Sequence, residues 1–283
     1  MIRRELKLNE GAAIWLFVSQ VEHAHVSGEL IASWSEAFSP DVVEAIRHHD
    51  DGWADWESAP KINLKIGAPY SFLEMPLAES LAIWDGSIAA ASKFGPLGGW
   101  IVAGHFYNLL ADSDHANEPP AVAWLTAKRK IRTAWLDEWV RADRSHTLEY
   151  AKRAQQILLT ADLFSLWLCC DCPVEAPSPC PLPEGEGSDG SILDQSVMKP
   201  RLDSLLKQFR FVLPECTICE SLSKHRVEGL SWIVPVEPYP YTISPLVLSA
   251  SAVVAPVSRY GSWPEIEAAS WPMELSWRLV PAV

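Results

Sequence analysis

Residues 41–53 read DVVEAIRHHDDGW, an apolar helical stripe that runs directly into two histidines and two aspartates. Val42, Ile46 and His49 recur at intervals of four and three residues, which is the spacing of one helix face. A histidine next to an aspartate offers an imidazole nitrogen and a carboxylate oxygen to one cation. Because a carboxylate on an inward face needs a partner or a metal, the pair His49-Asp50 predicts a metal site.

Three more ionisable residues, His23, His105 and Asp162, fall on apolar helix faces by the same spacing. His23, for example, shares its face with Val26 and Leu30. For any one inward histidine, a plain role in the core is the commoner explanation. Together with the His-Asp pair, however, they make five such groups on separate helices, which packing alone explains less easily. A mixed set of nitrogen and oxygen donors suits Mn, Fe, Mg, Zn or Ni.

The hydrophobic periodicity predicts that the chain is mainly α-helical up to about residue 170. A strand is expected over residues 13–18, followed by a loop rich in Trp, Gly and Pro over residues 51–75. Helices are expected over residues 20–35, 40–49, 76–94, 99–112, 119–142 and 146–170. Short alternating stretches near the C-terminus predict strands at 230–234, 241–243 and 275–280.

These elements predict three segments. Residues 1–172 are expected to form a helical domain with an N-terminal strand. Residues 173–200 are rich in proline, glycine and acidic residues and poor in large apolar ones, which is typical of a disordered insertion. Residues 201–283 are expected to form a small β-rich lobe that packs on the helical domain.

The composition restricts the partners. The chain of 283 residues has a formal net charge of -13 and no block of lysine or arginine, which argues against a nucleic acid polymer as partner. A small phosphorylated substrate remains possible, because a bound metal inverts the local charge. The apolar runs are too short or too interrupted to span a membrane, so a cytoplasmic protein is expected. The oligomeric state is left open.

The order of His23, His49-Asp50 and Asp162 resembles the signature of the HD-domain metal-dependent phosphohydrolases. The segment HDDGW is similar to the HD-x-G-K turn of that superfamily, with Trp53 standing where lysine is common. The resemblance implies an HD-domain-like helical bundle. It also implies one or two divalent ions (Mn, Fe, Zn or Mg), with the four ordered residues as ligands. Such ions acidify a bound water and polarise a phosphoryl oxygen.

Five further residues are candidates for the chemistry around these ligands. His105 resembles the extra histidine of two-metal members, and it is expected to bind a second ion or carry a proton. Gln20, one turn before the first histidine, is expected to orient that histidine or the substrate. Glu57 is a candidate for acid–base catalysis, although a plain loop carboxylate explains it equally well. Trp53 and Trp56 form either a hydrophobic plug under the loop or a wall of the substrate pocket.

A closer resemblance is to an uncharacterised bacterial family of the DUF3891 type, which brings no established reaction with it. The similarity covers most of residues 10–172. The motifs that carry it are Gln20-x-x-His23-Ala24-x-x-Ser27-Gly28, Ala45-Ile46-x-x-His49-Asp50-x-Gly52-Trp53-x-x-Trp56, Gly67-x-Pro69, His105 and Asp162-Leu163-x-Ser165-Leu166-Trp167-Leu168-Cys169.

Two cysteine motifs allow a second kind of site. A C-C-x-C motif spans residues 169–172 and a C-x-x-C motif spans residues 216–219, which together supply enough thiolates for a tetrahedral zinc. Nothing in the sequence brings the two segments together, so reduced thiols without a function are the simpler expectation.

Three functions therefore compete. The first is a metal-dependent phosphohydrolase that acts on a small phosphoester or nucleotide. The second is a di-iron oxygenase of the same fold that oxidises a small polyol or phosphonate, with His105 as an added iron ligand. The third is a non-enzymatic binding protein with a vestigial metal site, in which the five inward residues need not converge.

Overall fold

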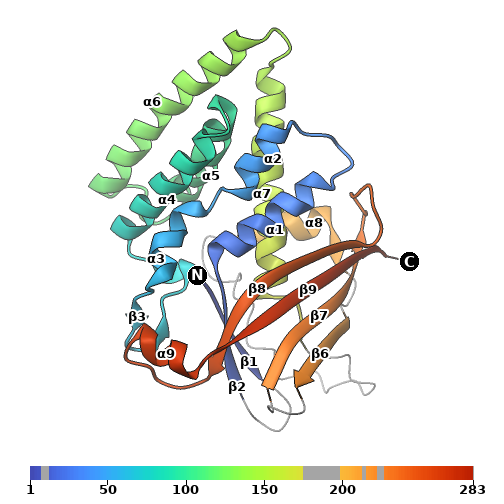
Figure 1. The fold of residues 1–283 in the computed structure, drawn as a ribbon. Helices are drawn as coiled ribbons and strands as arrows, with labels where there is room; N and C mark the ends of the chain where they lie inside the picture. The colour runs from blue at the N-terminus through green and yellow to red at the C-terminus, as the bar shows by residue number, and fades with distance from the viewer. Residues whose placement is uncertain (8–12, 175–197, 212–214, 222–225, 283) are drawn as a thin grey trace.

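The computed structural model describes residues 1–7, 13–174, 198–211, 215–221 and 226–282. Its elements form two parts, a group of helices and a large curled sheet (Figure 1). The strands of the sheet come from both ends of the chain, and the helical group is built from the segment between them.

The helices begin and end close to where the apolar periodicity places them, and the helix expected over residues 119–142 has those bounds. Polar side chains start two of them, because Ser19 accepts a hydrogen bond from the amide of Glu22 and Thr147 accepts one from the amide of Tyr150. The main helices are α1 (Gln20–Ala32), α2 (Pro40–Arg47), α4 (Leu77–Ser92), α5 (Pro96–Ala111), α6 (Pro119–Ala142) and α7 (Leu148–Cys170).

The segment expected to be a loop contains short elements. They are the 3-10 turns η2 (Asp51–Trp53) and η3 (Phe72–Glu74), the helix α3 (Ala54–Ser58), and the paired strands β3 (Ile62–Asn63) and β4 (Ala68–Pro69). The turn η2 packs against α4 and so holds the end of the HHDD run against the helical group.

The sheet has seven strands in the described part of the chain, and all its pairs are antiparallel except β7 with β9. The N-terminal strand β2 pairs with β8, with Val18 opposite Ala252. The strand order is β1 (Ile2–Lys7), β2 (Ala13–Val18), β8 (Leu246–Pro256), β9 (Trp271–Pro281), β7 (Arg226–Glu237) and β5 (Arg210–Phe211), with β6 (Glu215–Ser221) also paired to β7.

This architecture corrects the expected fold class. A mainly α, HD-domain-like bundle with a small C-terminal β lobe is wrong, because the sheet is large and includes both N-terminal strands. The longest late apolar run, from about Leu246 to Val257, contains serines and a proline that interrupt it in the sequence, but its alternating burial makes Leu246–Pro256 the long strand β8. Residues 241–243 form only an isolated bridge, between Tyr241 and Trp34.

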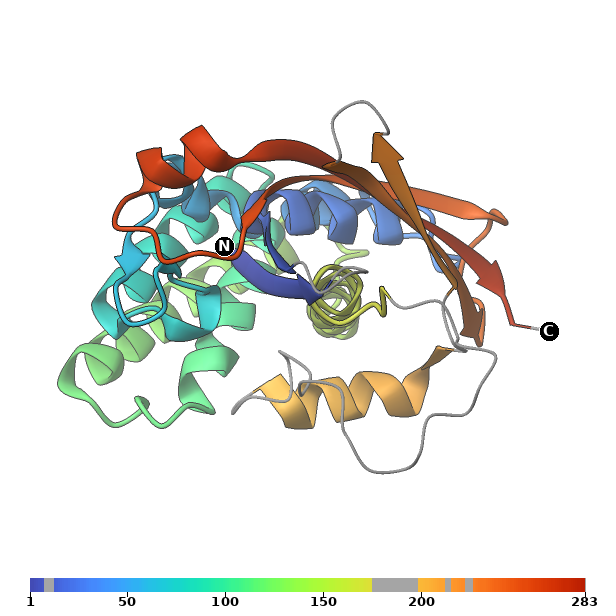
Figure 2. The ribbon, with the colours of Figure 1, turned by 90° about the horizontal axis from the view of Figure 1, so that it is seen from below.

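The boundary between the helices and the sheet is a shared core rather than a linker. One cluster of buried side chains contains Ile2 of β1, Leu168 of α7 and the stacked indoles of Trp232 and Trp277. Figure 2 shows α7 end-on between the sheet and α8 (Lys199–Gln208). The C-terminal half of α7 is therefore covered on several sides, which explains its nearly continuous burial.

Two other expectations concern the proline-rich insertion and membrane-spanning segments, and both are compared only with the described residues. Most of the proline-rich insertion, residues 175–197, lies outside them, while Lys199 and Pro200 begin α8 rather than extend the insertion. Among the described helices, none combines the length and the apolar character that crossing a bilayer requires.

Candidate metal centre

Four segments bring five buried ionisable side chains to one place. His23 comes from α1, His49 and Asp50 from the turn that follows α2, His105 from α5, and Asp162 from the middle of α7. Each of these residues is at most 6 % exposed. The inward orientation expected from helical spacing is therefore found for all five.

The side chains approach each other closely. The Nε2 atom of His23 lies 3.2 Å from Asp50 Oδ2 and 3.4 Å from Asp162 Oδ1. The Nε2 atom of His49 lies 3.3 Å from Asp162 Oδ1 and 3.8 Å from Asp50 Oδ2. One ligand atom each from His23, His49 and Asp162 lies within 4.8 Å of the others, a spacing that fits a single ion.

The outer nitrogens of the two histidines are held by hydrogen bonds. His49 Nδ1 donates to the carbonyl of Ile46 at 2.7 Å, so its Nε2 carries the lone pair when the ring is neutral. The hydroxyl of Ser165 donates to the carbonyl of Asp162 at 2.9 Å and accepts from His23 Nδ1 at 2.7 Å. Ser27 adds a further hydroxyl at 2.7 Å from Ser165. Such contacts fix the tautomer and the orientation of histidine ligands.

The electrostatics show how the two carboxylates act on the histidines. Burial alone would lower the pKa of His49, but the carboxylates of Asp50 and Asp162 outweigh it and raise that pKa to about 9. Although burial opposes ionisation of Asp162, the surrounding histidines, His105 first, hold its pKa well below the usual range. Two buried carboxylates therefore require positive charge here, from a proton on His49 or from a cation.

A divalent cation fits this donor set. Two imidazole nitrogens with fixed outer hydrogen bonds and two carboxylates make a mixed nitrogen and oxygen set of the kind that Mn, Fe or Zn accepts. His23, His49 and Asp162 are the core of the set, and Asp50 lies beside them. The expectation of a site able to hold a metal is met by these residues, and the identity of the metal stays a prediction.

A cavity of about 170 Å³ opens beside the centre, and His23, Asp50 and Asp162 form part of its wall. Trp53 lies on the same wall, and Trp56 packs edge-on against Trp53 with its indole N–H donating to Glu79. A role for either residue in binding a substrate stays a prediction. Sequence reasoning missed the other aromatic and apolar lining residues, which come from η3, α4, α5, α7 and the residue before α8: Phe72, Leu73, Trp84, Phe106, Leu109, Leu166 and Met198.

Gln20 and Glu57 have different surroundings. Gln20 is 2 % exposed, lines the cavity, and its Oε1 has no hydrogen-bond partner among the described residues. Glu57 binds the amine of Met1 at 2.9 Å and the backbone N–H of Gln20 at 2.8 Å through the same oxygen. Burial raises the pKa of Glu57. Its contacts tie the start of α1 in place, whereas Gln20 faces the space that a substrate would occupy.

His105 lies beside His49, with 5.7 Å between the ring centroids, and approaches the other oxygen of Asp162. Its Nε2 is 3.8 Å from Asp162 Oδ2, whereas His23 and His49 approach Oδ1. Burial lowers the pKa of His105 to about 4, so the ring is neutral near pH 7. Its Nδ1 is buried and has no partner in the described part of the chain. The two oxygens of Asp162 thus face different histidines, Oδ1 towards His23 and His49 and Oδ2 towards His105.

The HHDD run divides between two clusters. His49 and Asp50 face inward, while His48 and Asp51 join His25 in a second group of possible metal ligands that is only half-buried. His48 Nδ1 lies 2.8 Å from Asp51 Oδ2. Consecutive residues on a helical turn are about 100° apart, so His48 and Asp51, three residues apart, share a face that differs from that of His49.

Two glycines allow the close approach that positions these ligands. A Cβ added to Gly28 would lie 2.6 Å from the Cβ of Arg47, so α2 crosses α1 only at a glycine. A Cβ on Gly52 would lie 2.0 Å from the carbonyl oxygen of Ile83 in α4, and the amide of Gly52 donates to Ser87. The glycine of the HDDGW segment is therefore explained by packing against α4.

The structure describes the side chains of the first cysteine motif but not the cysteine side chains of the second. Cys169 and Cys170 are buried in α7, and burial raises the pKa of Cys169 to about 12, which keeps it a thiol. The side chains of Cys216 and Cys219 lie outside the described residues. The zinc hypothesis therefore stays untested.

Comparison with known proteins gives one match. The model of the family described as "Protein of unknown function (DUF3891)" matches residues 1–253, which include the helical group and most of the described sheet. No curated protein and no solved structure matches the chain. Nothing in these comparisons links the chain to the HD-domain superfamily.

Proposed function

The chain belongs to this DUF3891 family, whose function is unknown, and we propose that it is a metal-dependent phosphohydrolase acting on a small phosphoester or nucleotide. The observation that carries the proposal is the convergence of His23, His49 and Asp162, with Asp50, beside a cavity whose wall includes His23, Asp50 and Asp162. The order of these residues along the chain, similar to that of the HD-domain phosphohydrolases, supports phosphoester chemistry by analogy only.

The chain supplies the binding and positioning groups for such a reaction. His23, His49, Asp50 and Asp162 would hold the cation. A bound divalent cation supplies an acidified water and a Lewis acid for a phosphoryl oxygen. Gln20 presents an unpartnered Oε1 to the cavity and is placed to accept a hydrogen bond from a water or a substrate hydroxyl. The aromatic side chains beside it, Trp53 among them, exclude water and suit an organic leaving group.

The position of His105 favours a second candidate function. Because the two oxygens of Asp162 face different histidines, that carboxylate is placed to bridge two ions, and two irons would permit an oxygenase instead of a hydrolase. The third alternative, a binding protein with a vestigial site, did not require the five inward residues to converge. One ligand atom each from His23, His49 and Asp162 lies within 4.8 Å of the others, so separation of these residues gives that alternative no support.

The test is hydrolysis of p-nitrophenyl phosphate and of nucleoside monophosphates by protein loaded in turn with Mn, Zn or Fe(II). We expect metal-dependent release of phosphate that His49→Ala and Asp162→Asn abolish. His115→Ala is the matched control, since His115 is an exposed histidine that pairs with Glu118 away from the centre. Metal-loaded protein that releases no phosphate but consumes oxygen with iron bound would replace the hydrolase with the oxygenase.

A further inference from the structure

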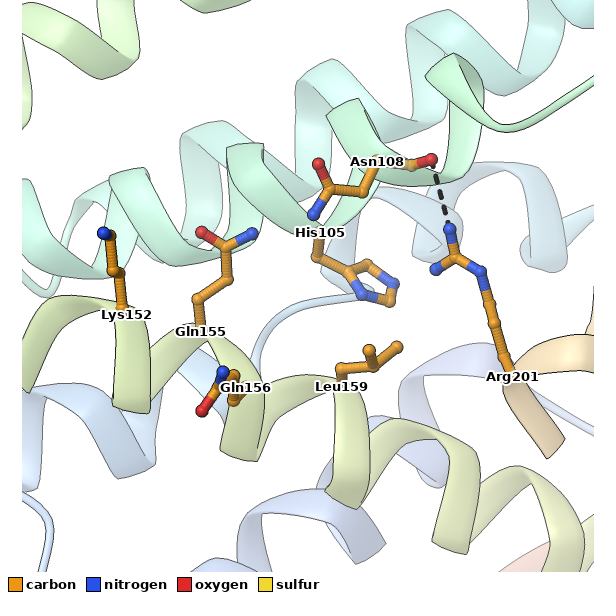
Figure 3. A pocket seen from close by; sticks show the side chains of 7 residues that line it. All are labelled: His105, Asn108, Lys152, Gln155, Gln156, Leu159 and Arg201. Carbon is orange, nitrogen blue, oxygen red and sulfur yellow. Dashed lines mark hydrogen bonds between the residues drawn. The ribbon is translucent and has the colours of Figure 1, made fainter. Parts of the chain in front are cut away.

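A second cavity, of about 250 Å³, lies on the other side of His105 from the metal centre. It is formed between α5, α7 and α8, and Figure 3 shows its lining side chains. His105 also lines the first cavity, so the two spaces adjoin at this residue. The residues that matter for its chemistry are His105, Asn108, Lys152, Gln155 and Arg201.

The charge of this cavity is opposite to that of the chain. The protein has a net charge of -13, yet the lining residues that the structure describes include two cations, Lys152 and Arg201, and no carboxylate. Arg201 is held by Nη2, which donates to the backbone carbonyl of Asn108 at 3.1 Å and to Asp112 at 2.8 Å. The Asp112 side chain is 65 % exposed, so water screens its charge.

Several donors in the cavity remain available. The Nη1 and Nε atoms of Arg201 make no hydrogen bond with any residue that the structure describes, and neither does the ammonium group of Lys152. Gln155 Oε1 already accepts from Arg132, which leaves its amide nitrogen to donate. In Figure 3 that nitrogen and the guanidinium of Arg201 lie on either side of the His105 ring.

His105 adds an observation that packing does not explain. Its Nδ1 is buried and has no partner within the described residues, although an unpaired buried nitrogen is unfavourable. Gly104 lets the Gln155 amide pack closely against α5, because a Cβ at this position would lie 2.7 Å from that amide and 2.5 Å from Nη2 of Arg132. A ligand in the cavity would give this imidazole a hydrogen-bond partner.

We propose that this second cavity binds an anionic group of the substrate, a phosphate or a carboxylate, through Arg201, Lys152 and the Gln155 amide. The assignment of that anion to the substrate rests on the proposed function, in which the scissile phosphoester lies at the metal centre. The substrate is then a small molecule with two anionic groups, such as a nucleotide with more than one phosphate or a phosphorylated acid. Guanidinium and ammonium groups with an amide donor are the usual partners of such anions.

Titration calorimetry of chelator-treated protein with inorganic phosphate at low ionic strength tests the proposal, with acetate as the second probe. Removal of the metal keeps phosphate from binding at the other centre. We expect saturable binding of phosphate, and weakening by about ten-fold in Arg201→Gln, since one charge-assisted contact is lost. Lys152→Gln, an exposed position with little risk to folding, is expected to weaken it by a few-fold. Tighter binding of acetate than of phosphate would assign the cavity to a carboxylate.

Two matched controls make the result specific. Arg153→Gln removes an arginine that also pairs with an exposed carboxylate, Glu36, but lies outside the cavity. Lys130→Gln removes an exposed lysine of α6 that does not line it. Both controls are expected to bind phosphate within about two-fold of the parent protein.

The proposal is overturned if neither probe binds saturably to the metal-free parent protein, or if Arg201→Gln and Lys152→Gln both bind as tightly as the controls. The failure of the proposed function gives a different pattern. In that case the protein takes up no metal, while anion binding and its dependence on Arg201 persist.

Discussion

The hydroxyl of Ser165 offers a sharp test of how the metal centre is organised. Ser165 is fully buried, and its Oγ lies 2.7 Å from His23 Nδ1 and 2.9 Å from the carbonyl oxygen of Asp162. Ser165→Ala removes the acceptor that orients His23 while leaving every proposed ligand in place. Loss of such a contact behind a histidine ligand weakens metal binding by about 10- to 100-fold. At about 1.4 kcal/mol for each factor of ten, this corresponds to roughly 1.4–2.7 kcal/mol.

The assay is competition between the protein and a chromophoric chelator for Zn or Mn. Thr160→Ala is the control, because Thr160 lies on the same helix but its hydroxyl donates to the carbonyl of Gln156 within α7. We expect the control to keep the parent affinity within about two-fold, with both variants folded by circular dichroism. Parent-like affinity in Ser165→Ala would refute the argument that this hydroxyl positions His23.

Three further predictions address the centre, its pH dependence and the fold. Asp162→Asn is expected to lower metal affinity by about a thousand-fold or more, measured by the same competition, because it removes a charged ligand shared by the histidines. The pKa of His49 is raised to about 9 from an ordinary value of 6.5, so its contribution to stability is present below pH 6.5 and is lost as the pH rises through about 9. In urea titrations of the metal-free protein, the free energy of unfolding is expected to fall by an amount on the order of 2–3 kcal/mol across that pH window. The His49→Gln variant is expected to show none of this fall. Gly52→Ala is expected to destabilise the protein by about 2–4 kcal/mol in the same titrations, because its Cβ would overlap a carbonyl of α4, whereas Ala54→Ser at an exposed position nearby is expected to change little.

Each of these predictions has an outcome that would contradict it. Tight metal binding by the Asp162 variant would remove that residue from the donor set. A flat dependence of stability on pH between 6.5 and 9 would show that His49 is not held in its charged form by the carboxylates. Parent-like stability of Gly52→Ala would show that η2 and α4 are not in close contact.

The helices and the inward residues could be predicted from the sequence because their signals are local. Helical spacing places His23, His49, His105 and Asp162 on apolar faces, and in the structure all four are buried around one centre. Ser165 could also have been given a role, since it lies three residues after Asp162 on the same face of α7. Local periodicity is therefore enough to find the donor set.

The sheet could not be predicted in the same way, because strand pairing depends on residues far apart in the chain. Nothing in the local pattern at Val18 indicates that its partner is Ala252. The strand β8 also has serine at exposed positions along its length, which made an alternating strand look like a broken apolar run. The resemblance of a few ligand positions to a helical superfamily then favoured a bundle, and the long-range pairs overturned it.

Glu57 and the outer cluster of His25, His48 and Asp51 show a second limit. Glu57 was a candidate for acid–base chemistry because a loop carboxylate beside a site has no visible partner in sequence. In the structure it binds the amine of Met1 and the amide of Gln20, a combination that only the folded arrangement of β1, α1 and α3 creates. The outer cluster was missed because His25 lies on α1, and nothing in the sequence indicates that the fold brings it beside His48 and Asp51.

The metal content of protein purified without chelators tests the central claim most directly, with elemental analysis repeated after dialysis against Mn, Fe(II) or Zn. We predict about one or two bound equivalents in the parent protein, lost in His49→Ala and Asp162→Asn, and retained in a His25→Ala/His48→Ala double variant that removes only the outer cluster. Parent protein that contains no transition metal and takes up none on dialysis would contradict the account.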